Sequence, residues 1–235
     1  MTRPRVVGVV PARGGSSGLK GKNMRLLPPE DRETLPSRQV RVGREAGLLE
    51  AVYITSDHRT IRTWCEDAGA RAIVRPAELA AADVPILPVL VHAAMHIAQD
   101  MPPPDGLMLL SPSYPRRTAA DVARVYWEFA RDTARPLVGL VPARCAPELL
   151  FWGSHGGLVP VAANALSASG RRQDRAPAYE ACLFACVVPF DRLRAGGRIG
   201  PNLLSEDMRG VVLDPAQVLD IDTMIDWQGI EGGRI

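Results

Sequence analysis

The chain has 28 Lys and Arg residues, of which only two are lysines. Both lysines lie in one glycine-rich segment near the N-terminus. The segment reads Pro11-Ala12-Arg13-Gly14-Gly15-Ser16-Ser17-Gly18-Leu19-Lys20-Gly21-Lys22-Asn23. Backbone N–H groups that few side chains cover, together with fixed cations, form the usual cradle for a polyphosphate. The alternative is an ordinary connector with surface lysines. We predict a phosphate-binding loop in which Arg13 and Lys22 hold the phosphates.

A second pattern with chemical potential lies near the C-terminus, where Asp220 and Asp222 flank Ile221. On an extended segment, residues two apart point to the same side, so the two carboxylates face one way. Carboxylate oxygens suit a hard divalent cation, and we predict Mg²⁺ that bridges phosphates. The alternative is a solvated strand edge or a helix cap.

Several common sites are excluded by spacing. A P-loop needs G-x-x-x-x-G-K-[ST], but Gly15 and Gly21 are separated by five residues and Asn23 stands at the hydroxyl position. The dinucleotide fingerprint G-x-G-x-x-G is also absent. The spacing of the four cysteines matches no zinc pattern. His92 and His96 lack a nearby carboxylate motif and are interpreted as helix-surface residues.

Composition limits the class of protein. The chain has 235 residues, a net charge of +2, and 46% apolar but only 5% aromatic residues. These values predict one globular domain over residues 1–235, without nucleic-acid or membrane partners. With no visible signal peptide and no apolar run of membrane-spanning length, we expect a cytoplasmic protein.

Short apolar runs alternate with amphipathic segments along the chain. The predicted strands cover residues 5–10, 51–55, 71–74, 106–110, 136–141, 183–188 and 210–213. The predicted helices cover residues 37–47, 58–68, 84–98 and 118–131, with Asp57 and Thr118 as N-caps. This alternation predicts an α/β protein with a Rossmann-like, doubly wound and mostly parallel sheet.

Ligands of such sheets bind beyond the carboxyl ends of the strands. We therefore expect the glycine loop, residues 55–57 and residues 111–117 to meet in one crevice. Residues 142–179 break the alternation and carry a basic cluster at 171–175. We interpret this stretch as an excursion used for dimerisation or for covering the acceptor; the alternative is a surface insertion.

Six motifs occur in one order along the chain. They are Arg13-Gly14-Gly15-Ser16 with Lys22-Asn23, Thr55-Ser56-Asp57, Arg75-Pro76-Ala77-Glu78-Leu79-Ala80 with Asp83, Ser111-Pro112-Ser113-Tyr114-Pro115-Arg116-Arg117, Arg172-Gln173 and Asp220-Ile221-Asp222. Together they resemble the cytidylyltransferase family of CMP-sialic acid synthetase, whose members make CMP-activated acidic sugars. The resemblance implies the fold of the nucleotide-diphospho-sugar transferases, CTP as substrate, and a homodimer.

The resemblance also distributes roles over the motifs. The catalytic residues would be Arg13, Lys22 and Asp222, and the metal ligands Asp220 and Asp222. Nucleotide binding would fall to Ala12, Arg13, Gly14, Gly15, Ser16, Lys22, Asn23, Arg75 and Asp83. Acceptor binding would fall to Ser111, Arg116, Arg117, Arg172 and Gln173.

Departures from the family pattern concern the acceptor. Ser17 replaces a family lysine, although Lys20 is close enough to supply the charge; Ser111 replaces a glutamine. Cys182-Leu183 replaces an Asn-Gly pair. Because polar groups that would read a large sugar are missing, we predict a small anionic acceptor, such as the phosphonoformate used in the phosphonate, antibiotic-producing branch of the family. The alternatives are a nonulosonic acid of the sialic acid type, a nucleotidyltransferase that uses GTP or UTP, and a nucleotide-binding partner protein without catalysis.

Overall fold

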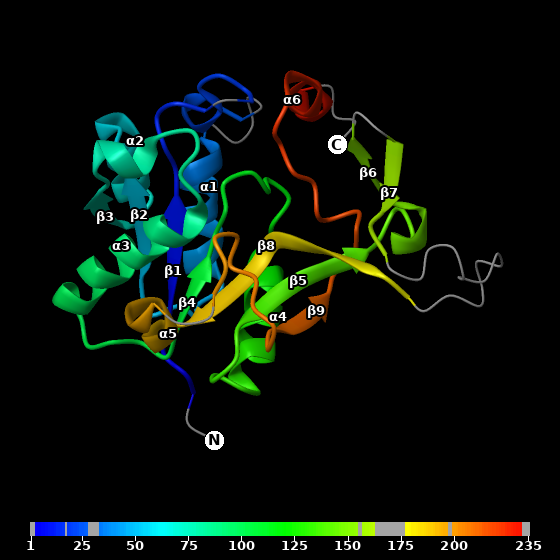
Figure 1. Ribbon diagram of the computed structural model, residues 1–235. Helices are drawn as coiled ribbons and strands as arrows, with labels where there is room; N and C mark the ends of the chain where they lie inside the picture. The colour runs from blue at the N-terminus through cyan, green and yellow to red at the C-terminus, as the bar shows by residue number, and fades with distance from the viewer. Residues whose placement is uncertain are drawn as a thin grey trace.

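One seven-stranded sheet runs through the molecule in the strand order β3-β2-β1-β4-β8-β5-β9. The computed structural model describes residues 3–16, 18–27, 33–154, 157–162, 177–196 and 199–231. The strands are β1 (Val6–Pro11), β2 (Val52–Ser56), β3 (Arg71–Val74), β4 (Gly106–Leu109), β5 (Leu137–Pro142), β8 (Tyr179–Pro189) and β9 (Arg209–Val212). Figure 1 shows β1 and β4 between β2 and β8.

All neighbouring strands are parallel except where β8 takes part. β8 is antiparallel to β4 and to β5, whereas β1 pairs in parallel with both β2 and β4. The chain leaves β1 toward β2 on one side and later returns to β4 on the other. This change of direction makes the carboxyl ends of β1 and β4 the expected ligand edge.

Helices cover both faces of the sheet (Figure 1). They are α1 (Leu35–Glu45), α2 (Arg59–Asp67), α3 (Ile86–Asp100), α4 (Ala119–Ala130), α5 (Phe190–Ala195) and α6 (Met224–Glu231). One core combines the sheet with α1, α2 and α4, and the other combines it with α3 and α5. A third, small cluster joins α6 to the glycine loop through Trp227 and Leu19.

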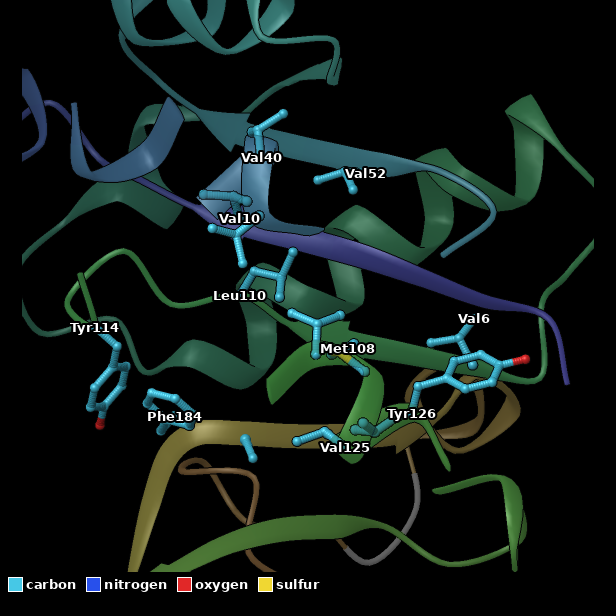
Figure 2. Close-up of a cluster of buried hydrophobic side chains, with 14 of the residues drawn as sticks. Val6, Val10, Val40, Val52, Met108, Leu110, Tyr114, Val125, Tyr126 and Phe184 are labelled. Atoms are coloured by element: carbon cyan, nitrogen blue, oxygen red, sulfur yellow. The ribbon is translucent and has the colours of Figure 1, made fainter. Parts of the chain in front are cut away.

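Successive valines of β1 serve opposite cores. Val6 and Val10 belong to the first cluster, and Val7 and Val9 to the second, because side chains alternate across a strand. Figure 2 shows Val6 and Val10 among the apolar side chains of the first core. All four valines are fully buried, so β1 is anchored on both faces and the loop that follows it starts from a fixed point.

The predicted fold class is confirmed, and every predicted strand and helix has a counterpart with slightly shifted ends. The Thr118 cap is confirmed as a capping box with Asp121. The predicted Asp57 cap is wrong: His58 is the N-cap of α2, and the Asp57 carboxylate instead accepts the N–H of Gly14 at 2.9 Å. Helix α6 was not predicted from the sequence.

The excursion at residues 142–179 contains a short 3-10 turn and a two-stranded sheet of β6 (Phe151–Ser154) and β7 (Gly157–Pro160). Figure 1 shows this hairpin away from the main sheet. Residues 163–176 lie outside the described part of the chain. Across the described ranges, no helix has both the length and the apolar character that crossing a bilayer requires.

Candidate functional site

A cavity of about 290 Å³ opens at the carboxyl ends of β1 and β4. It brings together residues that are far apart in sequence, from the glycine loop, the 111–117 loop and the C-terminal segment. The lining polar and charged side chains are Arg13, Ser16, Lys22, Asn23, Arg75, Ser111, Ser113 and Asp222. The expected convergence of the glycine loop and the 111–117 loop is therefore confirmed, whereas residues 55–57 do not line the cavity.

The glycine loop is closed by its own polar groups. The Ser16 hydroxyl donates to the Leu19 carbonyl and accepts the Lys22 N–H at 3.1 Å. Gly21 has φ +68°, a left-handed conformation that glycine adopts at little cost, and it starts the short turn at Lys22–Met24. The turn places Lys22 and Asn23 at the cavity.

Lys22 is the best-anchored cation of the site. Its ammonium donates to Ser113 Oγ at 2.9 Å, to the Ile221 carbonyl at 2.8 Å and to Asp222 Oδ1 at 2.9 Å. The Lys22 side chain is 14% exposed, and that of Asp222 is 68% exposed. One ammonium thus joins the glycine loop to the 111–117 loop and to the C-terminal segment.

Gly18 allows the glycine loop to approach the C-terminal segment closely. A Cβ at Gly18 would lie 2.4 Å from the Asp222 carbonyl oxygen, closer than two such atoms can come. At Gly15, a Cβ would meet nothing within 4 Å. Gly18 therefore fixes the spacing between Lys22's loop and Asp222.

We expect Gly18→Ala to lower the melting temperature by several degrees, because the loop must move away from Asp222 and a backbone clash typically costs about 1–3 kcal/mol. Gly15→Ala is the matched control and should melt close to the wild type. Differential scanning fluorimetry measures both. Equal melting temperatures for the two variants would contradict the close packing at Gly18.

Two buried polar side chains face the cavity beside the loop. Asn23 donates from Nδ2 to the Arg13 carbonyl at 3.0 Å, while its buried Oδ1 has no partner in the structure. Arg75 is 5% exposed and donates from Nη2 to the Thr55 carbonyl at 2.6 Å. Burial lowers the pKa of Arg75 to about 10; the Asp57 carboxylate opposes this and the Arg13 guanidinium adds to it. Arg75 therefore remains charged at neutral pH, close to a second cation.

Of the two aspartates near the C-terminus, Asp222 lines the cavity and Asp220 does not. Ile221 between them is fully buried against Trp227, and its N–H donates to the Ser113 carbonyl at 2.8 Å. Partial desolvation raises the pKa of Asp220, the Asp222 carboxylate raises it further, and the Lys22 ammonium opposes both. A divalent cation would relieve this repulsion between carboxylates, so the donor set fits the predicted metal.

A divalent cation at this place would have few protein ligands. Within the described ranges, no group of three or more Asp, Glu, His or Cys side chains could hold a metal. Mg²⁺ usually binds through one or two carboxylates together with water and substrate phosphates, so two aspartates are a sufficient protein contribution.

The predicted acceptor residues do not all lie at the cavity. Ser111 lines the cavity. Arg117 does not: it is 2% exposed and bonds to the Phe184 and Ser111 carbonyls, so its predicted contact with an acceptor does not fit its position. Arg116 is exposed, donates to the Ala216 carbonyl at 2.7 Å and does not line the cavity. Arg172 and Gln173 lie outside the described residues.

The predicted nucleotide residues also differ in position. Ala12 is buried and donates its N–H to the Thr55 carbonyl at 3.1 Å, and the Gly14 N–H is taken by Asp57. These two residues build the loop and do not offer N–H groups to a ligand. Gly15 and Asp83 are exposed but do not line the cavity.

An apolar wall of the cavity was missed by sequence reasoning. It comes from the short turn Ala77–Ala80, the start of α3 and strand β8. The lining apolar residues are Pro11, Leu79, Ala81, Ala82, Val84, Ile86, Val89, Leu109, Pro112 and Leu183. Helical spacing had indicated that α3 packs on the sheet, but nothing in that spacing shows that its first turn borders a site.

Comparisons with known proteins agree with this geometry. A family model described as "Cytidylyltransferase" matches residues 7–99. Post-translational flagellin modification protein B of Campylobacter coli is 27% identical over 229 residues, covering 94% of this chain and 91% of that protein. N-acylneuraminate cytidylyltransferase of Escherichia coli O18:K1:H7 (strain RS218 / NMEC) is 28% identical over 120 residues, which cover 51% of this chain but 27%, about a quarter, of that protein.

A similar fold occurs among solved structures. CMP:2-keto-3-deoxy-manno-octonic acid synthetase, solved as a complex with CTP, superposes with a TM-score of 0.69 at 14% identity, and 98% of each chain is covered. The family model covers β1, the glycine loop and Arg75, which are the parts that build one side of the cavity. The chain is thus similar in sequence to cytidylyltransferases, most clearly over residues 7–99, and it shares its fold with a CTP-binding synthetase.

Proposed function

We propose that this protein transfers CMP from CTP to a small anionic acceptor and releases pyrophosphate. The observation that carries the proposal is the cavity, which is lined by the cations Arg13, Lys22 and Arg75 and by the Asp222 carboxylate. In this reaction an acceptor oxygen attacks the α-phosphorus and the bond to the pyrophosphate oxygen breaks. Catalysis of such transfers is mainly positioning and neutralisation of phosphate charge, which three cations supply.

The triphosphate would lie along the glycine loop. Arg13 is suited to two-point contact with phosphate oxygens, while Lys22 acts as a point charge that Ser113 and Ile221 already orient. Because Lys22 is held before any ligand arrives, little rearrangement is needed when negative charge moves to the leaving group. Pre-oriented charge of this kind stabilises a transition state most effectively.

The nucleoside would occupy the side of the cavity formed by Asn23, Arg75 and the apolar wall. The unpartnered Oδ1 of Asn23 would accept a hydrogen bond from a nucleoside amino or hydroxyl group, because a buried acceptor without a partner costs free energy. A thermal-shift comparison of CTP, UTP, GTP and ATP tests the base: the largest stabilisation by CTP supports cytidine recognition.

The metal is the predicted Mg²⁺, held by Asp220 and Asp222. When bound, it would neutralise phosphate charge during transfer. The Asp222 side chain is 68% exposed, so its carboxylate can turn toward a cation. Lys22 keeps two further acceptors, Ser113 and Ile221, when Asp222 does so.

Ser111 and Leu183 line the acceptor side and offer one hydroxyl and one apolar surface. This favours a small acceptor such as a phosphonate, whose ionised oxygen needs no strong base. The name of one relative, N-acylneuraminate cytidylyltransferase, and the buried position of Arg117 favour the alternative, a nonulosonic acid.

³¹P NMR of the protein with CTP, Mg²⁺ and either phosphonoformate or N-acetylneuraminate tests both acceptors. A coupled phosphonate–phosphate pair with pyrophosphate supports the phosphonate, and turnover with N-acetylneuraminate alone supports the nonulosonate. CTP binding by calorimetry without pyrophosphate from any acceptor would support the binding-only alternative and contradict the proposed transfer. The absence of CTP binding would contradict the assignment of the cavity.

We also propose a homodimer that forms through the β6–β7 hairpin. Trp152, Leu158 and Val159 are 67%, 71% and 55% exposed, and Trp152 pairs directly with Val159 across the two strands. An isolated two-stranded sheet is only marginally stable in water, and a contiguous apolar patch usually marks an interface.

Replacing Trp152 with Glu is expected to turn the dimer into a monomer, because a charge would be desolvated at the interface. Light scattering after size exclusion measures the mass. Trp127 on α4 is 53% exposed and gives the matched control, Trp127→Glu, which should leave the mass unchanged. A monomeric wild type would contradict the dimer.

A further inference from the structure

The glycine loop is held near its start by the two residues that follow β2. Asp57 accepts the Gly14 N–H on its carboxylate at 2.9 Å, across 43 positions of the chain. Gly14 also lies against His58, because a Cβ at Gly14 would stand 3.0 Å from both the Cβ and the Cδ2 atom of His58. Gly14 is therefore fixed both by a hydrogen bond and by packing.

Hydrogen bonds fix the backbone before, at and after Arg13. Ala12, the residue before it, donates its N–H to the Thr55 carbonyl at 3.1 Å. The carbonyl of Arg13 itself accepts a hydrogen bond from Asn23 Nδ2 at 3.0 Å. Gly14, the residue after it, donates to the carboxylate described above. Because the side chain of Arg13 lines the cavity, these bonds set where its guanidinium can reach.

Of the groups that hold this backbone, Asp57 can be changed without changing the cavity itself. Asn23 lines the cavity, and the bond of Ala12 joins two backbone groups, whereas the Asp57 side chain does not line the cavity. Any effect of Asp57 on a bound ligand must therefore pass through the groups that it binds or through its charge.

The charge of Asp57 alone would oppose the proposed ligand. Burial lowers the pKa of Arg75, and the Asp57 carboxylate is close enough to oppose this shift. A negative charge at this place repels a triphosphate and offsets part of the attraction that the cations Arg13 and Arg75 exert. The two roles of Asp57, as hydrogen-bond acceptor and as charge, therefore predict opposite effects of its removal on nucleotide binding.

We propose that Asp57 is a positioning residue: by holding the Gly14 N–H, its carboxylate fixes the backbone of Arg13 so that the guanidinium meets the phosphates of the nucleotide. The proposal rests on the proposed CTP site. Two-point contact between a guanidinium and phosphate oxygens requires a defined geometry. A backbone that is ordered before the ligand binds lowers the cost of reaching that geometry.

The experiment measures the dissociation constant of CTP by calorimetry in the presence of Mg²⁺, for the wild type and for two variants. Asp57→Ala removes both the acceptor and the charge, and we expect CTP to bind about 10-fold more weakly, the usual effect of losing a hydrogen bond to a charged group. Asp57→Asn removes the charge but keeps an oxygen that accepts the Gly14 N–H, so CTP should bind within about threefold of the wild type. If the role of Asp57 were only electrostatic, both variants would bind CTP more tightly than the wild type.

Asp214→Ala is the matched control. Asp214 is also exposed, also accepts a backbone N–H at 2.9 Å and does not line the cavity, so this variant should bind CTP as the wild type does. Asp57 is exposed and is not the N-cap of α2, so Asp57→Ala should fold, which differential scanning fluorimetry checks.

The Arg13→Met background shows whether Asp57 acts through Arg13. If it does, the guanidinium that Asp57 positions is already missing in this background. Adding Asp57→Ala should then weaken CTP binding by less than about twofold, because two residues that act through one contact are not additive.

Different outcomes separate the two proposals. If the wild type binds CTP and Asp57→Ala binds it as tightly or more tightly, the positioning role is overturned while the CTP site stands. A loss in Asp57→Asn as large as that in Asp57→Ala also overturns it, because the effect would then belong to the charge. An undiminished loss in the Arg13→Met background overturns it as well, since Asp57 would then act through another group. If the wild type binds no CTP, the proposed function fails first.

Discussion

Replacing Lys22 with Met is expected to reduce the rate of pyrophosphate release by about 10²- to 10³-fold, the usual loss when one pre-oriented donor to a transition state is removed. Lys22 is anchored by Ser113, Ile221 and Asp222, so its charge points into the cavity before the substrate binds. Methionine keeps the length of the side chain and removes the charge. The variant should therefore fold and still bind CTP, more weakly than the wild type.

The chain provides its own control, because its other lysine is two residues away. Lys20 is exposed and does not line the cavity. Lys20→Met should keep the wild-type rate within about twofold if Lys22 carries the phosphate contact alone. An equal loss in both variants would instead mean that Lys20 supplies the charge for which the family uses a lysine at the position of Ser17. Coupled pyrophosphate detection at saturating CTP measures both rates.

The convergence of distant loops was predictable because it depends on topology. The alternation of strands and helices indicates parallel strands, and the carboxyl ends of such strands share an edge. Two hydrogen bonds result directly from this topology. The Gly14 N–H donates to the Asp57 carboxylate, and the Lys22 ammonium donates to the Ser113 hydroxyl. The side chains of Asp57 and Lys22 differ in type, but the course of the backbone places both at the same edge of the sheet.

The role of Arg117 was not predictable, because burial depends on packing that no local pattern encodes. Arg116 and Arg117 are adjacent in sequence, and both were expected at the acceptor. Residues 183–185 of β8 have no counterpart on β5, and the carbonyl of Phe184 among them accepts a hydrogen bond from Arg117 in the core. Arg116 instead donates to the Ala216 carbonyl at the surface. Position within the loop, and not the residue type, separates a core cation from a surface one.

The Asp57 cap failed for a related reason. An aspartate before a helix usually binds the first free N–H groups of that helix. Here the glycine loop presents a competing N–H from Gly14, and the carboxylate binds it at 2.9 Å. The sequence identifies the carboxylate that accepts a hydrogen bond. It does not show which of two N–H groups, that of Gly14 or that of the helix, the fold brings to this carboxylate.

Replacing Asp222 with Asn is expected to reduce turnover at least about 10²-fold, since loss of a metal ligand removes several kcal/mol of charge stabilisation and each 1.36 kcal/mol is a factor of ten. Asparagine has the same shape, and the Asp222 side chain is 68% exposed, so folding should not change. Asp214→Asn is the control on the same C-terminal segment: Asp214 is exposed and accepts the Ala216 N–H at 2.9 Å. Full Mg²⁺-dependent activity in Asp222→Asn would contradict the metal assignment.

The double variant Lys22→Met with Asp222→Asn separates two interpretations of their 2.9 Å ion pair. If both groups act on the same triphosphate, the double variant should be only slightly slower than the slower single variant, as residues that act as a unit are not additive. If the two groups serve separate steps or separate parts of the substrates, each variant loses an independent function and the two losses multiply. Rates of all four proteins over a range of Mg²⁺ concentrations distinguish these cases. Non-additive loss at saturating Mg²⁺ would show that the ammonium and the carboxylate act as one unit.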